Sequence, residues 1–303
     1  MRNPLGAILA VIVMVAVGAR IARSSPRQTE VSSAERSQLD QRPLPDVPSL
    51  FRDIVKNQKA VEELRKLYTA HLSEEQDKTD SAGNVKSRSS NDYDVFYIGD
   101  EEVRHLLAKD GKPLNGDAKR REDDRFNKEF DKLKKKQAEL AADPKKQAKQ
   151  EEQEEAEISD FLRAETFTNP RRTTLRGEDV IAFDFAGNPN YKPKKEIDRI
   201  IQKLSGVMWI DDQSREIARL EAYFVESAHI AGGVLASLQK GSSFVFEQQK
   251  TNGEVWLPSY AEVHVAGRIV IVRLKLNFID RYNDYRKFRV GGSVIGTVGP
   301  APN

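Results

Sequence analysis

Ile269 to Phe278, IVIVRLKLNF, alternates apolar and polar residues from Val272 onward. Every second residue from Val270 is apolar, and the polar residues all lie at the positions between: Val270, Val272, Leu274, Leu276 and Phe278 against Arg273, Lys275 and Asn277. A strand turns successive side chains to opposite faces, whereas a helix would scatter these apolar residues around its circumference. We therefore predict one strand here, with one face in an apolar interior and the other in water.

Four similar segments precede this one, and turn residues separate them. The segments are GVMWID (206–211), REIARLEAYFV (215–225), SFVFEQQ (243–249) and SYAEVHVA (259–266). Between them lie the turn sequences Asp211-Asp212-Gln213-Ser214, Lys240-Gly241 and Asn252-Gly253. Successive strands at hairpin spacing predict an antiparallel sheet, so the expected fold class is α+β with mostly antiparallel β structure.

The overall composition restricts the class of protein. A chain of 303 residues can bury a sizeable core, but 32% charged and 38% hydrophobic residues indicate a globular part diluted by a charged segment. The formal net charge is only +2, from 49 basic and 47 acidic residues, so no nucleic-acid partner is expected. The absence of cysteine excludes disulfides, thiol nucleophiles and thiolate metal sites.

The N-terminus has the pattern of an export signal. In residues 1–19 a short basic start precedes an apolar run over residues 5–18, which as a helix would be about 21 Å long, less than the roughly 30 Å of a bilayer core. We interpret residues 1–19 as a signal peptide cleaved after Ala19. The alternative is an uncleaved inner-membrane anchor, because three positive charges follow the apolar run: Arg20, Arg23 and Arg27. Either outcome predicts a periplasmic or otherwise extracytoplasmic protein.

One β domain is expected over residues 47–289. Residues 20–46 are polar and proline-containing, which predicts a disordered tether, and the Gly-rich residues 290–303 predict a disordered tail. From Val47 to about Leu67, apolar residues at helical spacing predict a helix that packs on the sheet: Leu50, Phe51, Ile54, Val55, Val61 and Leu64.

Residues 117–160 differ in kind from the rest of the domain. They hold 12 basic and 14 acidic residues and a narrow apolar seam: Phe126, Phe130, Leu133 and Leu140. This pattern predicts a charged helical insertion, coiled-coil-like, that packs on itself or on the edge of the domain. An arm that docks envelope proteins is the alternative.

Little in the sequence indicates catalysis. The four histidines lack metal-ligand spacing, and no nucleophile elbow, phosphate loop or calcium loop is present, so neither metal nor cofactor is predicted. Three strand carboxylates, Glu221, Glu247 and Glu262, are conceivable as a glycosidase acid and base. Alternating strands carry charges on their wet face routinely, so we predict a protein that is not an enzyme.

The apolar residues of the predicted strands either fill the core or line a cavity. A sheet that is too curved to be filled by its own side chains leaves such residues around a binding cavity. Pattern alone leaves both alternatives open. The candidate ligand-binding residues are Trp209, Leu220, Phe224, Phe244, Phe246, Val272, Leu274, Leu276 and Phe278.

Two stretches carry a family resemblance. GVMWIDDQSREIARLEAYF, from Gly206, followed by LASLQKGSSFVFEQQKTNGEVWLPSYAEV, resembles the outer-membrane lipoprotein-sorting superfamily (LolA/LolB-like). The motifs are G-x-x-W-I-D at Gly206–Asp211 and G-E-x-W-L-P at Gly253–Pro258. VRHLLAKDGKPL (103–114) before a charged helix is similar to larger, uncharacterised exported relatives. The resemblance covers most of residues 47–289.

The resemblance implies a curved, unclosed antiparallel half-barrel with helices on its concave face and an apolar cavity for a lipid acyl chain. The chain departs from the carriers in its charged insertion and in lacking a counterpart of their functional arginine. We therefore expect a monomeric, exported lipid- or lipoprotein-binding protein. The alternatives are an envelope interaction protein with a filled core and a charged arm and, more distantly, a carboxylate hydrolase.

Overall fold

The structure is a computed structural model that describes residues 43–80, 84–98, 101–230, 236–269 and 272–287. The predicted signal segment, most of the predicted tether and the predicted tail lie outside these residues. Within the described ranges, no helix has the length and apolar character needed to cross a membrane.

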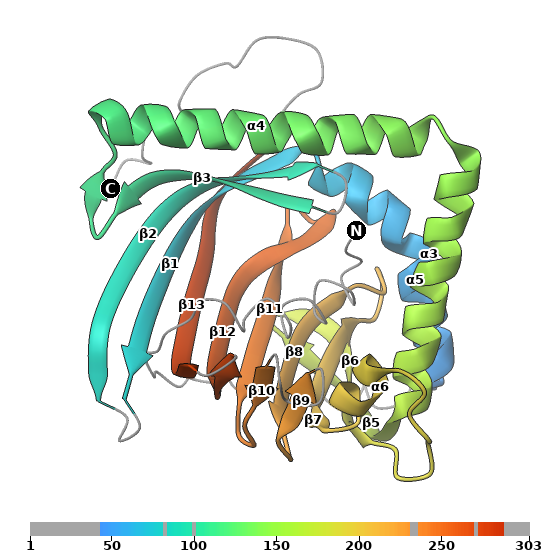
Figure 1. Cartoon of the computed structure of the whole chain (residues 1–303). Coiled ribbons are helices and arrows are strands. Elements are labelled where there is room, and N and C mark those ends of the chain that lie inside the picture. Colours follow the sequence, from blue (N-terminus) through green and yellow to red (C-terminus); the bar gives the residue numbers. More distant parts are fainter. Residues whose placement is uncertain (1–42, 81–83, 99–100, 231–235, 270–271, 288–303) are drawn as a thin grey trace.

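A single antiparallel sheet dominates the chain, with its strands in the order β4-β3-β2-β1-β13-β12-β11-β8-β7-β6-β5 and the short β9 and β10 beside β12. The strands are β1 Tyr68–Thr79, β2 Val85–Ile98, β3 Glu101–Lys109, β4 Lys112–Pro113, β5 Glu165–Leu175, β6 Glu178–Gly187, β7 Leu204–Asp211, β8 Ile217–Phe224, β9 Ala228–Ile230, β10 Ala236–Leu238, β11 Ser243–Thr251, β12 Val255–Ile269 and β13 Val272–Lys287. The sheet curls without closing (Figure 1). The predicted class, α+β with an unclosed and mostly antiparallel half-barrel, is confirmed.

The strand predicted over residues 269–278 is wrong in one respect. Ile269 pairs with Val272 across neighbouring antiparallel strands, so β12 ends and β13 begins inside this stretch. Residues 270–271, which connect the two strands, lie outside the described part of the chain. Residues 269–272 are all apolar and include no Gly, Pro or Asn, so no turn signal marked the hairpin in the sequence.

Helix α3, Val47–Arg65, begins at the predicted position. The Asp46 side chain accepts a hydrogen bond from the Ser49 backbone N–H at 2.9 Å, which caps the helix, and Pro48 suits the first turn. Its apolar stripe buries Leu50, Phe51 and Ile54 against the sheet. Figure 1 shows α3 at the right of the curled sheet, running upward beside α5, with the short α6, Glu196–Ile201, below it.

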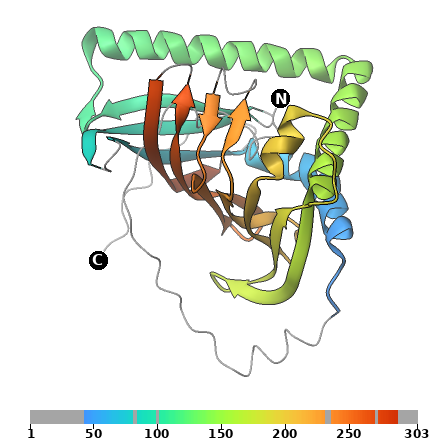
Figure 2. The ribbon, with the colours of Figure 1, turned by 60° about the horizontal axis from the view of Figure 1, so that its bottom comes forward.

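Helices α4, Gly116–Ala141, and α5, Pro144–Ala164, connect the two free edges of the sheet. Strands β4 and β5 are the outermost strands, and the chain passes from one to the other through these helices alone. Figures 1 and 2 show α4 running along one rim and α5 turning away from it at a steep angle, so the pair forms a bracket around the opening.

Helix α4 is attached to the sheet near its middle, and α5 at its C-terminal end. Phe126 of α4 stacks on Phe96 of β2 and on His105 of β3, with ring centroids 5.3 and 4.6 Å apart. At the other end, Phe161 of α5 is buried in the core, and Asp160 pairs with Lys195 ahead of α6. The charged segment thus lies along the domain edge over most of its length and enters the core only at its C-terminal end.

Candidate functional site

The strand register defines one face of the sheet, which we call the inner face. Two rows of direct cross-strand partners lie on it. The first crosses β6, β7, β8, β11 and β12 at Phe183, Met208, Leu220, Phe246 and Ala261. The second crosses β8, β11, β12 and β13 at Ala222, Phe244, Val263 and Phe278. The same face continues through Glu74 and Leu72 of β1 to Val95 and Arg104. It is therefore apolar at the β6 side, whereas toward the β3 side the polar Glu74 and Arg104 lie beside the buried Leu72 and Val95.

The apolar half of the inner face is filled by the protein's own helices. Leu220, Phe224 and Phe244, three of the predicted lining residues, are 2%, 4% and 6% exposed and belong to the buried cluster that α3, α5 and α6 complete. At its centre the Phe51 ring lies 5.6 Å from that of Phe161 and 5.7 Å from that of Phe167. These three predicted residues therefore share one buried cluster with the side chains of the helices.

A strip beside this cluster is less covered. Phe246 and Phe278 are only half-buried, although their neighbours Val263, Val265 and Leu276 on the same face are buried. Phe246 lies opposite Ala261 and Phe278 opposite Val263, so the two rings occupy adjacent strand pairs. We call Phe246, Ala261, Val263, Leu276 and Phe278 the apolar strip. The side chains of Val272 and Leu274, also predicted to line a cavity, lie outside the described part.

Trp209 lies on the opposite, outer face of the sheet. Along β7 the inward positions are taken by Met208 and Ile210, so Trp209 points the other way, into a small cluster with Val180, Ala218 and Trp256. The Arg219 guanidinium carbon lies 5.7 Å from the centre of its ring. The structure thus separates Trp209 from the other candidate residues.

At the β3 side, the inner face carries a polar group that the sequence analysis did not single out. Arg104 donates hydrogen bonds from Nη1 to Glu74 Oε2 at 3.1 Å, from Nε to Glu102 Oε1 at 2.6 Å and from Nη2 to Asp280 Oδ2 at 3.1 Å. The Tyr282 hydroxyl donates to Glu102 Oε2 at 3.1 Å. We call Arg104, Glu74, Glu102 and Asp280 the Arg104 cluster.

The cluster lies where water reaches it poorly. Burial raises the pKa of Asp280 to about 6, although the Arg104 charge acts in the opposite direction. Glu74 also accepts hydrogen bonds from Asn91 Nδ2 at 2.9 Å and from the Tyr93 hydroxyl at 3.3 Å. The sequence signal for the cluster was limited to Glu102 and Arg104, two residues apart on one face of β3, because Glu74 and Asp280 lie 30 and 176 positions away along the chain.

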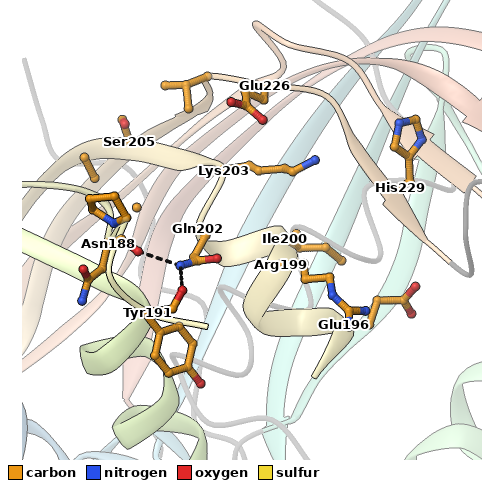
Figure 3. A pocket seen from close by; sticks show the side chains of 14 residues that line it. Asn188, Tyr191, Glu196, Arg199, Ile200, Gln202, Lys203, Ser205, Glu226 and His229 are labelled. Atoms are coloured by element: carbon orange, nitrogen blue, oxygen red, sulfur yellow. Dashed lines mark hydrogen bonds between the residues drawn. The ribbon is translucent and has the colours of Figure 1, made fainter. Parts of the chain in front are cut away.

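A second candidate is a cleft of about 690 Å³ beside α6 and β9, which Figure 3 shows from close by. Gln202 Nε2 fixes its wall by donating to the backbone oxygens of Asn188 at 2.7 Å and Tyr191 at 2.9 Å. Its charged side chains have both signs: Arg199, Lys203, Glu196 and Glu226. None of the predicted binding residues lines this cleft, and its mixed charges do not favour one ligand class.

The strand carboxylates weighed as a catalytic pair lie on the outer face in ion pairs. Arg219 binds both Glu221 and Glu247, and His264 Nε2 lies 2.9 Å from Glu262 Oε1. The hydrogen bond with His264 lowers the pKa of Glu262, which disfavours the protonated acid that glycoside hydrolysis needs. Within the described ranges, no group of three His, Asp or Glu side chains is placed to hold a metal ion.

No family model and no curated protein sequence matches the chain. Comparison with solved structures finds a LolA superfamily protein from Nitrosomonas europaea at 11% identity and a TM-score of 0.27, covering 82% of this chain and 96% of that one. A Vibrio parahaemolyticus domain assigned to outer membrane lipoprotein sorting has 9% identity and a TM-score of 0.29, with 80% and 93% covered.

A DUF1329 family protein from Desulfovibrio piger gives a similar result, with 11% identity, a TM-score of 0.26, and 82% of this chain and 95% of that chain covered.

Proposed function

We propose that this chain is an exported, non-enzymatic lipid- or lipoprotein-binding protein of the periplasm that holds an acyl chain against the apolar strip of its inner face. The observation that carries the proposal is the incomplete covering of Phe246 and Phe278 on an otherwise buried apolar face. A ligand can contact half-buried aromatic rings on a concave surface while the helices stay packed against the rest of the core.

Burial of one acyl chain on the apolar strip would supply enough free energy for binding. Each methylene removed from water contributes about 0.8 kcal/mol, so ten of them contribute roughly 8 kcal/mol before ordering costs are subtracted. Because the helices already cover Leu220, Phe224 and Phe244, the acyl chain would contact only the apolar strip beside them and not the whole inner face. No catalytic group is required for this function.

Binding of a fluorescent fatty acyl probe tests the proposal. Phe246→Lys places a charge on the strip and should weaken probe binding about tenfold or more, because an ammonium group in an apolar contact is costly. Val245→Lys is the matched control, since Val245 lies one residue away on the outer face beside Glu221 and Glu262. It should leave binding within about twofold of wild type.

A second candidate function rests on the filled half of the inner face. If the core has no room for a ligand, the chain is an envelope interaction protein, and the charged outer side of the bracket formed by α4 and α5 is the surface it offers to other proteins. Wild-type protein that melts cooperatively but binds no acyl probe would establish this second function in place of the first.

A further inference from the structure

The Arg104 cluster has more negative than positive charge. Three carboxylates, Glu74, Glu102 and Asp280, surround one guanidinium. Among the residues that the structure describes, Arg65 of α3 is a second cation near this region, with its guanidinium carbon 5.9 Å from the centre of the Tyr97 ring. Three negative charges against two positive ones leave one carboxylate charge uncompensated when Asp280 is ionised.

One buried carboxylate oxygen at the cluster also lacks a partner. Asp280 Oδ1 finds no hydrogen-bond donor among the residues that the structure describes. The Tyr97 hydroxyl, opposite Glu102 on the inner face, interacts with the Tyr285 hydroxyl instead. Buried polar groups in folded proteins are nearly always hydrogen-bonded, so the cluster has one more acceptor than its own donors satisfy.

The cluster adjoins the apolar strip and is open on one side. Asp280 follows Phe278 by two residues on β13, so their side chains lie about 7 Å apart along the same face. The Arg104 side chain is one-third exposed, at 33%, which leaves a route from solvent. A ligand with its chain on the strip therefore brings its polar end to the cluster.

We propose that the Arg104 cluster binds the primary ammonium group of an amphiphile whose acyl chain occupies the apolar strip. The inference rests on the proposed function and names the head group that the same site takes. An ammonium group carries three donors and no acceptor, which suits the carboxylate oxygens of Glu102, whose side chain is 23% exposed, and of its neighbour Asp280. Its charge also balances the cluster, whereas an anionic head group would add a fourth negative charge beside three carboxylates.

Calorimetric titration of the full chain at pH 7.5 tests the head-group preference. The probes are decylammonium, decanoate and decyl maltoside, which share one alkyl chain and differ in charge. Decylammonium should bind at least about tenfold more tightly than decanoate, because hydrogen bonds to charged groups are the stronger kind. Short-chain phosphatidylethanolamine and free ethanolamine then distinguish a lipid head group from a soluble amine, and only the lipid should bind strongly.

Two neighbouring carboxylates provide the matched variants. Glu74 faces the cluster, whereas Glu75 pairs with Arg281 at 2.6 Å on the outer face. Glu74→Gln should reduce decylammonium affinity about tenfold and spare decanoate, while Glu75→Gln should change neither. Asp280→Asn, which keeps the shape of the side chain, replaces Glu74→Gln if the latter does not melt cooperatively.

The outcomes separate the two proposals. Equal affinity for decylammonium and decanoate, or a preference that survives both cluster variants, overturns the ammonium site and leaves the acyl-binding function standing. Failure of all three alkyl probes to bind overturns the acyl-binding function, and the ammonium site with it. Strong binding of ethanolamine alone overturns the amphiphile and identifies a soluble amine as the ligand.

Discussion

Truncation of Phe51 to alanine probes whether α3 is an integral part of the core or a loosely held cover. Phe51 is fully buried, and its ring packs against three others: those of Phe161, Phe167 and Phe183, at 5.6, 5.7 and 6.2 Å between centroids. These partners come from α5, β5 and β6, so one side chain joins the helix to the sheet and to the end of the bracket.

The expected loss follows from burial and from these ring contacts. Burying a phenylalanine contributes about 1.5–3 kcal/mol, and each aromatic contact adds about 0.5–1.5 kcal/mol beyond its area. Phe→Ala changes in cores typically cost about 3–5 kcal/mol in total, because the surroundings relax only partly. We expect Phe51→Ala to lower the free energy of unfolding by about 4 kcal/mol.

Urea unfolding, followed by the fluorescence of Trp209 and Trp256, measures this loss. Lys56→Ala on the exposed side of the same helix is the control and should stay within about 0.5 kcal/mol of wild type. A Phe161→Ala variant and the double variant complete a cycle, in which contacting rings should show a coupling energy above about 0.5 kcal/mol. A loss below about 1 kcal/mol with an unchanged slope would refute the reasoning, because the aromatic cluster would then be too loose to hold the helix.

Three further predictions concern other parts of the fold. Gly206→Ala should lower the free energy of unfolding in urea by about 3 kcal/mol, because a Cβ there would overlap the Glu221 carbonyl oxygen and lie 2.8 Å from Phe185 Cζ. Wild-type stability in this variant would contradict the close approach of β7 to β8 at Gly206. Burial raises the pKa of Glu216 to about 7, above its unfolded value near 4.3, so the folded state is destabilised as pH rises from about 4 to 7. Glu216→Gln should therefore be more stable than wild type by about 3 kcal/mol at pH 8 and equal to it near pH 4, and parallel pH profiles would contradict this. Replacement of residues 117–160 by about 30 Gly/Ser residues should keep a cooperative melt, since α4 has no buried residue. The linker must be this long because one much shorter than the roughly 39 Å length of α4 would strain the two sheet edges. Loss of cooperativity with the long linker would show that the bracket belongs to the core.

The sequence by itself determined the local elements of this protein. The start of α3 at Val47, the alternation of β7, β8 and β11, and the turn at Asn252-Gly253, where both residues have positive φ, were predictable because each depends on neighbours within a few positions. The glycine of the G-x-x-W-I-D motif acquires its physical reason in the structure, as the point where β7 and β8 approach too closely for a side chain.

Only the tertiary structure decided which apolar residues face the helices and which polar ones meet. Trp209 and Met208 are adjacent and similarly apolar, yet the register with β6 and β8 turns one outward and the other into the core. Arg104 meets Asp280 across 176 positions of sequence because β1 pairs with β13 and brings the two ends of the domain together. Alternation gives a strand two faces, but the choice of inner face depends on long-range pairing and on the helices that cover it, and no local pattern contains that information.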